Sequence, residues 1–139
     1  MSAVVLYTPE VLGLAIELAA YSLADDLAFQ GEARSKSCGS AIVLGLTLDA
    51  EGAVERVGVK SHACAIGQAS AAIFAQSVRG MTGAQIRSAR DAIAVWLDQG
   101  GATPDWPGLE TIAAARAYPA RHGAVMLPWT AATQALSTG

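Results

Sequence analysis

Two short β-branched runs separated by a turn constrain the fold of this chain more than any other feature. The runs are AIVLGLTL at 41–48 and AVERVGVK at 53–60, with DAEG at 49–52 between them. Runs of this kind around a glycine-containing four-residue turn are typical of a β-hairpin. The segment AFQGEARSK at 28–36 predicts a third, edge strand, which Gly31 weakens. A small antiparallel sheet is therefore expected.

The segments around this sheet have helical spacing. Thr8-Pro9-Glu10 places an N-cap before a proline at the first helical position, which predicts a helix over 9–23. A second helix should follow Cys64 and end at Gly80.

Thr82 and Gln85 fit a capping box that begins a third helix, and Gly100-Gly101 ends it. After a loop at 102–108, a short helix at 108–117 and a last helix at 124–137 are expected, and Pro128 should kink the last one or reset its start. The predicted fold class is α+β: a single domain over 1–139, with a small three-stranded antiparallel sheet and helices packed on one face.

Composition excludes several classes of function. The chain has 139 residues, of which 53% are hydrophobic and 15% charged, and its net charge is -3. A disordered chain needs the opposite balance, and a nucleic-acid-binding domain needs a basic surface. The apolar stretch at 11–20 is too short to span a membrane and contains Glu17. A cytoplasmic protein with reduced thiols is expected, and no phosphate loop, HExxH or G-x-S-x-G motif indicates an enzyme.

The two cysteines, Cys38 and Cys64, are too few for a disulfide scaffold or a four-thiolate site within one chain. Opposed residues of a hairpin centred near Glu51 have a constant sum of residue numbers, and Cys38–Cys64 and Ser40–His62 both satisfy it. Side chains alternate along a strand, so the four would converge on one face at the end of the hairpin. A register shift of one residue would break this convergence.

Cys64 also precedes a predicted helix, where amide donors and the helix dipole stabilise a thiolate. Two thiolates and an imidazole would suit zinc or an iron–sulfur unit. The alternative is that both cysteines are small buried apolar residues and that His62 faces solvent or forms an ordinary hydrogen bond.

Three segments resemble motifs of one known family and follow one another in the order found in that family. SKSCGSAIVLGLTLDAEGAVERVGVKSHAC at 35–64, HACAIGQASAAIFAQSVRGMTGAQI at 62–86 and LETIAAARAYPARHGAVMLPWTAATQAL at 109–136 are similar to NifU-like (IscU/SufU-type) iron–sulfur cluster assembly scaffolds. The long stretch between the second cysteine and PAR is more similar to the SufU branch. The resemblance implies an α+β fold with a three-stranded antiparallel sheet.

The family normally holds metal with three cysteines and an aspartate. The first two cysteine positions match Cys38 and Cys64, whereas Ser40 occupies the aspartate position and Ala124 the third cysteine position. A hydroxyl is a poor ligand beside a carboxylate, and alanine cannot coordinate. Three compensations are open: His62 as a ligand, His122 as a ligand, or two chains that each contribute their two cysteines around a shared cluster.

The resemblance implies a scaffold or carrier rather than an enzyme. It would accept sulfur from a cysteine desulfurase together with iron, carry a nascent iron–sulfur cluster or a metal ion such as zinc, and serve recipient apo-proteins, alone or as a homodimer. A second hypothesis is a metal-free or zinc-carrying protein that binds the desulfurase, regulates it or accepts its sulfur. The third is an interaction module with inert cysteines.

Overall fold

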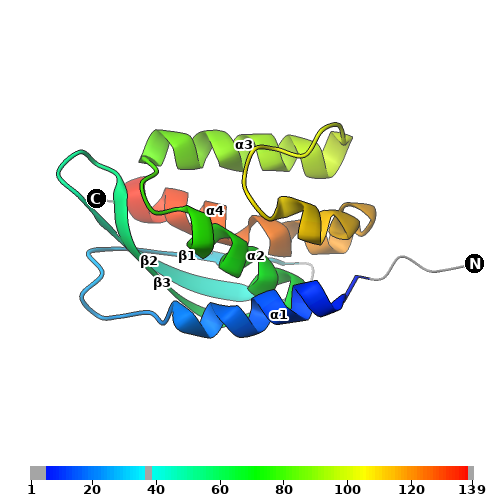
Figure 1. Cartoon of the computed structure of the whole chain (residues 1–139), viewed down its shortest axis with the longest axis horizontal. Coiled ribbons are helices and arrows are strands. Elements are labelled where there is room, and N and C mark those ends of the chain that lie inside the picture. The colour runs from blue at the N-terminus through cyan, green and yellow to red at the C-terminus, as the bar shows by residue number, and fades with distance from the viewer. Residues whose placement is uncertain (1–5, 37–38, 138–139) are drawn as a thin grey trace, which may run out of the picture.

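A three-stranded antiparallel sheet forms the base of the fold (Figure 1). The computed structural model describes residues 6–36 and 39–137. The strands lie in the order β1 (Phe29–Arg34), β2 (Ala41–Leu48) and β3 (Val54–His62). The predicted hairpin and edge strand are confirmed, and so is the α+β fold class.

The turn between β2 and β3 is held by its first residue. The Asp49 carboxylate accepts hydrogen bonds from the backbone N–H groups of Glu51 (2.9 Å) and Ala53 (3.0 Å). Gly52 has φ +84, a value that a residue without a Cβ adopts easily. The DAEG segment therefore forms the turn that its composition predicts.

The predicted register of the hairpin is wrong by one residue beyond a β-bulge. Leu48 pairs with Val54, but Thr47 pairs with Arg56, so β3 carries one extra residue at this point. Val54 is also bonded to a residue outside the sheet, because its N–H donates to the Met81 carbonyl at 2.8 Å. Such a bulge shifts every later pair by one position.

The first two helices begin at the predicted residues. Thr8 caps α1 (Pro9–Glu17) by accepting the Val11 N–H at 3.1 Å. The helix then tightens into a short 3₁₀ segment, η1 (Leu18–Ala20), so it ends earlier than predicted. Helix α2 (Ala65–Ser77) has Cys64 as its N-cap residue.

The later helices include two departures from expectation. The Thr82–Gln85 capping box starts α3 (Gly83–Gln99) as predicted. The short helix is a 3₁₀ helix, η2 (Leu109–Ala117), and another 3₁₀ turn, η3 (Pro119–Arg121), leads directly into α4 (His122–Ser137). Pro128 lies inside α4, which begins at His122 and is not reset at the proline.

The helices lie in layers on one face of the sheet, which we call the inner face (Figure 1). Helix α4 covers β1 and β2, α2 contacts α4 and α1, and α3 packs on the side of α4 away from the sheet. Gly31 permits the closest approach, since a Cβ there would collide with the Ala131 carbonyl oxygen of α4. The core between the layers contains a packed aromatic cluster of Phe74, Trp106 and Trp129.

The opposite, outer face of the sheet is covered in part by the chain between α1 and β1. The Tyr21 carbonyl accepts the Val59 N–H at 2.6 Å along the free edge of β3. Leu23 and Leu27 then cross over Gly45 and Gly58, where a Cβ would meet them at 3.0 Å or less. Among the described residues, no helix is long and apolar enough to cross a membrane.

Candidate functional site

Cys64 lies where β3 gives way to α2. Its carbonyl accepts the first helical hydrogen bond, from the Gln68 N–H at 2.9 Å. Its own N–H donates to Ser40 Oγ at 3.1 Å. The thiol is half-buried and makes no capping hydrogen bond. The backbone of Cys64 is therefore fixed on both sides, while its side chain is not used to build the helix.

Ser40 belongs to the short connection between β1 and β2. Its carbonyl accepts the Ser35 N–H at 2.8 Å, and the Ser35 carbonyl accepts the Gly39 N–H at 2.9 Å. Gly39 has φ +70, a conformation that favours glycine. Ser35 and Ser40 are both buried. Cys38 lies in this connection but outside the described residues.

The first turns of α2 and α4 meet beside Cys64. A Cβ on Gly67 would lie 3.7 Å from the Cβ of Ala124, which is fully buried. A Cβ on Gly123 would lie 2.7 Å from Ser35 Oγ. The Ala124 methyl thus occupies the packed junction between α2 and α4, on the same end of the sheet as Ser40 and Cys64.

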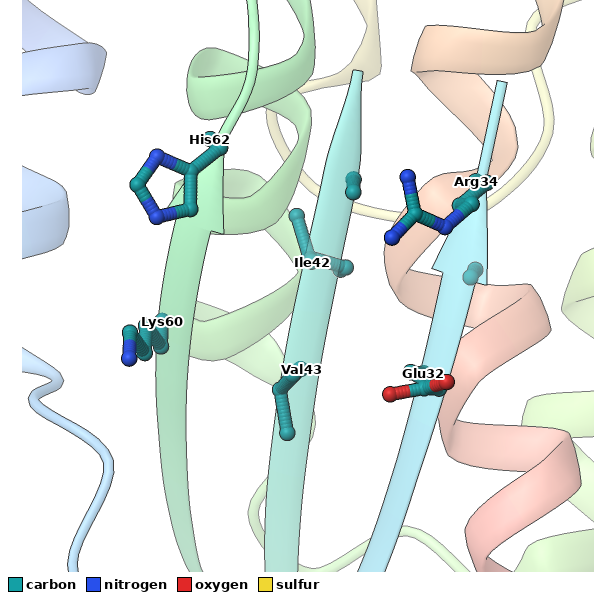
Figure 2. A pocket seen from close by; sticks show the side chains of 8 residues that line it. Glu32, Arg34, Ile42, Val43, Lys60 and His62 are labelled. Carbon is teal, nitrogen blue, oxygen red and sulfur yellow. The ribbon is translucent and has the colours of Figure 1, made fainter. Parts of the chain in front are cut away.

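His62 does not join this group. The bulge places it opposite Ala41 instead of Ser40, so the predicted convergence of His62 with Ser40 and Cys64 is wrong. Alternation along the strands puts His62 on the outer face, whereas Ser40 is buried in line with Ile42 on the inner face. His62 lies with Lys60 on β3 in Figure 2.

His122, the other histidine, is engaged elsewhere. Its Nε2 lies 2.9 Å from the Arg116 carbonyl oxygen. A carbonyl only accepts, so Nε2 carries the proton and donates this bond. His122 therefore anchors the start of α4 to the end of η2.

The described residues do not fit a metal ion. Within 6–36 and 39–137, no three histidine, cysteine or acidic side chains come together closely enough to hold one. The Ser40 hydroxyl already accepts the Cys64 N–H, and Ala124 offers only a methyl group. A zinc or iron site needs several thiolate, imidazole or carboxylate ligands, and this end of the sheet presents one thiol from the described residues.

Sequence reasoning missed two residues that shape this site. Ser35 holds the connection to Ser40, and Gly123 allows the start of α4 to approach Ser35, whose Oγ would lie 2.7 Å from a Cβ at that position. Ser35 could have been found from its position in the alternating pattern of β1, where 31, 33 and 35 share the inner face. The role of Gly123 depends on a contact between α4 and the connection after β1, which are far apart in the sequence, and it has no local signal.

The comparison with protein families identifies the family of this chain. Residues 8–123 match the family described as the NifU-like N-terminal domain. This match covers most of the chain, so the chain belongs to the NifU-like family, a family of iron–sulfur cluster assembly scaffolds. The resemblance to NifU-like proteins is thereby confirmed. No curated protein matches the sequence significantly.

Solved structures are similar over nearly the whole chain. The N-terminal part of a nitrogen-fixing NifU-like protein from Brucella abortus is 28% identical, with a TM-score of 0.86, and the alignment covers 95% of this chain and 92% of that one. A putative iron–sulfur cluster assembly scaffold protein for the SUF system from Fervidobacterium islandicum is 20% identical, with a TM-score of 0.83 and 94% and 96% covered. The second likeness concerns the fold alone.

Proposed function

We propose that this chain is an iron–sulfur cluster assembly protein that accepts sulfur on Cys64. The observation that carries the proposal is the position of Cys64 as the N-cap of α2, with its N–H held by Ser40 and its thiol half-exposed. Membership in the NifU-like family supports a role in cluster assembly.

The sulfur source we propose is the persulfide of a cysteine desulfurase. The Cys64 thiolate attacks the outer sulfur of the donor persulfide, because the thiolate is the nucleophilic form. A sulfur–sulfur bond forms at Cys64 as the donor's sulfur–sulfur bond breaks, and the donor cysteine leaves as a thiolate. The exchange has no net oxidation or reduction. The same exchange with a thiol of a recipient apo-protein unloads Cys64.

The surroundings of Cys64 support this use. Ser40 and Gln68 fix the backbone of the cysteine on both sides, at 3.1 Å and 2.9 Å. The alternative of an inert cysteine requires a thiol that solvent cannot reach, but Cys64 is only half-buried. We assign the chain to the SufU branch on the long stretch between Cys64 and the PAR segment.

The test is sulfur transfer from a purified cysteine desulfurase supplied with L-cysteine. Intact-mass analysis should show one added sulfur on the wild-type protein, and peptide mapping should place it on Cys64. Cys64→Ser should abolish the gain, while Cys38→Ser, the matched control with the other cysteine removed, should keep it. Equal loading of Cys64→Ser and wild type would overturn the proposal.

A folded-state labelling measurement accompanies this test. A maleimide reagent should modify Cys64 in the native protein, since the thiol is partly exposed. Complete protection of Cys64 until the protein unfolds would favour the inert interaction module instead.

A further inference from the structure

Part of the outer sheet face forms a shallow hollow lined by residues of all three strands (Figure 2). The chain segment before β1 crosses another part of this face at Gly45 and Gly58. Among the described residues, the part that this segment leaves uncovered consists of two rows that run across all three strands, and we call it the open half-face. The two rows are Glu32–Val43–Lys60 and Arg34–Ala41–His62.

The open half-face has an uncharged floor with one cation on each side, Arg34 and Lys60, and one carboxylate, Glu32. Val43 and Ala41 lie on the central strand, while Arg34 on β1 and Lys60 and His62 on β3 are exposed (Figure 2). Strands lie about 4.8 Å apart, so the two sides are separated by roughly 10 Å. A carboxylate side chain laid over the floor would therefore be flanked by cationic groups from both sides.

These cationic groups have no partner among the described residues. Neither Arg34 nor Lys60 forms an ion pair there, in contrast to Arg56 further along β3, which pairs with Asp26 at 2.9 Å. Glu32 is the acidic member of the two rows, and its side chain also makes no ion pair there. The local excess of positive charge occurs in a chain whose net charge is -3. It is therefore a feature of this face and not of the whole surface.

The shape of the open half-face indicates what kind of occupant it takes. The hollow has a volume of about 190 Å³. Sites for small organic ligands usually have about 300–1,000 Å³ and enclose most of the ligand. A shallow hollow with charged sides suits side chains presented by a protein surface, where complementary charge guides the encounter.

We propose that the open half-face is a docking surface for an acidic segment of a partner protein. Carboxylates of the partner pair with Arg34, which can bind one through two hydrogen bonds, and with Lys60. The Glu32 carboxylate repels the partner's carboxylates and therefore limits how far the acidic segment extends along β1. The docking itself does not depend on sulfur chemistry. Because Cys64 follows His62 by two residues, a partner seated here also lies at the end of the sheet that carries the thiol.

The test is an NMR titration of the isotope-labelled protein with an oligoglutamate peptide at low ionic strength. Backbone shifts should concentrate on the open half-face and diminish at high salt, which screens exposed charges. Arg34→Glu and Lys60→Glu should each weaken binding about threefold or more. Glu32→Gln should strengthen binding about twofold, because it removes the opposing charge.

Arg87→Glu is the matched control, since it makes the same charge change at an exposed position of α3. Cys64→Ser should bind the peptide like wild type, whatever its fate in sulfur transfer, so the two proposals fail separately. Equal weakening by Lys60→Glu and Arg87→Glu would overturn the docking surface. Equivalent shifts with free glutamate, tighter binding of a DNA oligonucleotide at the same residues, or the same shifts on self-association without peptide would also overturn it.

Discussion

At the end of the sheet near Cys64, the inner and outer faces carry different chemical groups. On the inner face, Ser40 and Ala124 are buried beside Cys64, and the only reactive group of this described set is a thiol. On the outer face, Arg34, Lys60 and His62 stand exposed. A single extra residue in β3 separates the two, because the bulge moves His62 away from Ser40 and onto the charged face.

The backbone around Cys64 is ordered by hydrogen bonds to Ser40 and from Gln68. The resemblance to the family implies that Ser40 and Ala124 stand at two of its ligand positions. The following predictions act on one face at a time.

The largest expected effect is a gain of metal on the inner face. Ser40→Asp combined with Ala124→Cys gives both positions the ligand types that the resemblance to the family implies. A complete structural zinc site binds with about 10–16 kcal/mol, so the double variant should retain about one zinc per chain after chromatography and unfold at a higher temperature. Metal analysis and thermal unfolding measure this gain.

Each single substitution is a control for that experiment and should retain far less zinc. The double variant combined with Cys38→Ser should lose the gain. If the double variant folds, as circular dichroism would show, and holds no more zinc than wild type, the inner end of the sheet does not preserve the family's ligand geometry.

Packing should also differ between the faces. Gly31→Ala inserts a methyl group against the Ala131 carbonyl of α4 and should lower the free energy of unfolding by about 3 kcal/mol. Val43→Ala on the half-exposed outer face should cost about 1 kcal/mol. Urea unfolding measures both, and equal costs would show that the inner face is not the tighter one.

Loss of the Ser40 hydroxyl tests the hydrogen bond that holds the Cys64 N–H. Ser40→Ala leaves the Cys64 N–H without its acceptor and should cost about 1–2 kcal/mol. Hydrogen exchange of the Cys64 amide should accelerate in the same variant. Ser88→Ala on the exposed surface of α3 is the control and should stay within about 0.5 kcal/mol of wild type. An unchanged exchange rate at Cys64 would contradict the role of Ser40.

The smallest effect concerns the ion pair on the outer face. A hydrogen bond from Arg56, together with its charge, lowers the pKa of Asp26. A carboxyl with a lowered pKa in the folded state stabilises the protein above its unfolded pKa of about 3.9, and this contribution is lost as the pH falls through the lower folded value. Arg56→Gln should raise the pKa of Asp26 in an NMR titration. An unchanged titration would mean that the pair does not form in solution.

The sequence was sufficient for the elements and their caps but not for the register. Thr8, Thr82 and the DAEG turn carry local signals, and the structure confirms each of them. The bulge in β3 has no such signal, because it arises where Val54 is also bound to Met81, a residue distant in the sequence. This one-residue error in the register led to the incorrect prediction that His62 lies on the same face as Ser40. Continuation of α4 through Pro128 likewise depends on packing between helices.

The most direct measurement is the composition of tag-free protein purified without oxygen and then exposed to a cysteine desulfurase and L-cysteine. Iron, zinc, acid-labile sulfide and the sulfur attached to Cys64 are determined on the same sample. We predict sulfur on Cys64 with substoichiometric metal and labile sulfide. Stoichiometric iron and labile sulfide that disappear in Cys64→Ser, without a persulfide on Cys64, would contradict sulfur acceptance and indicate a bound cluster.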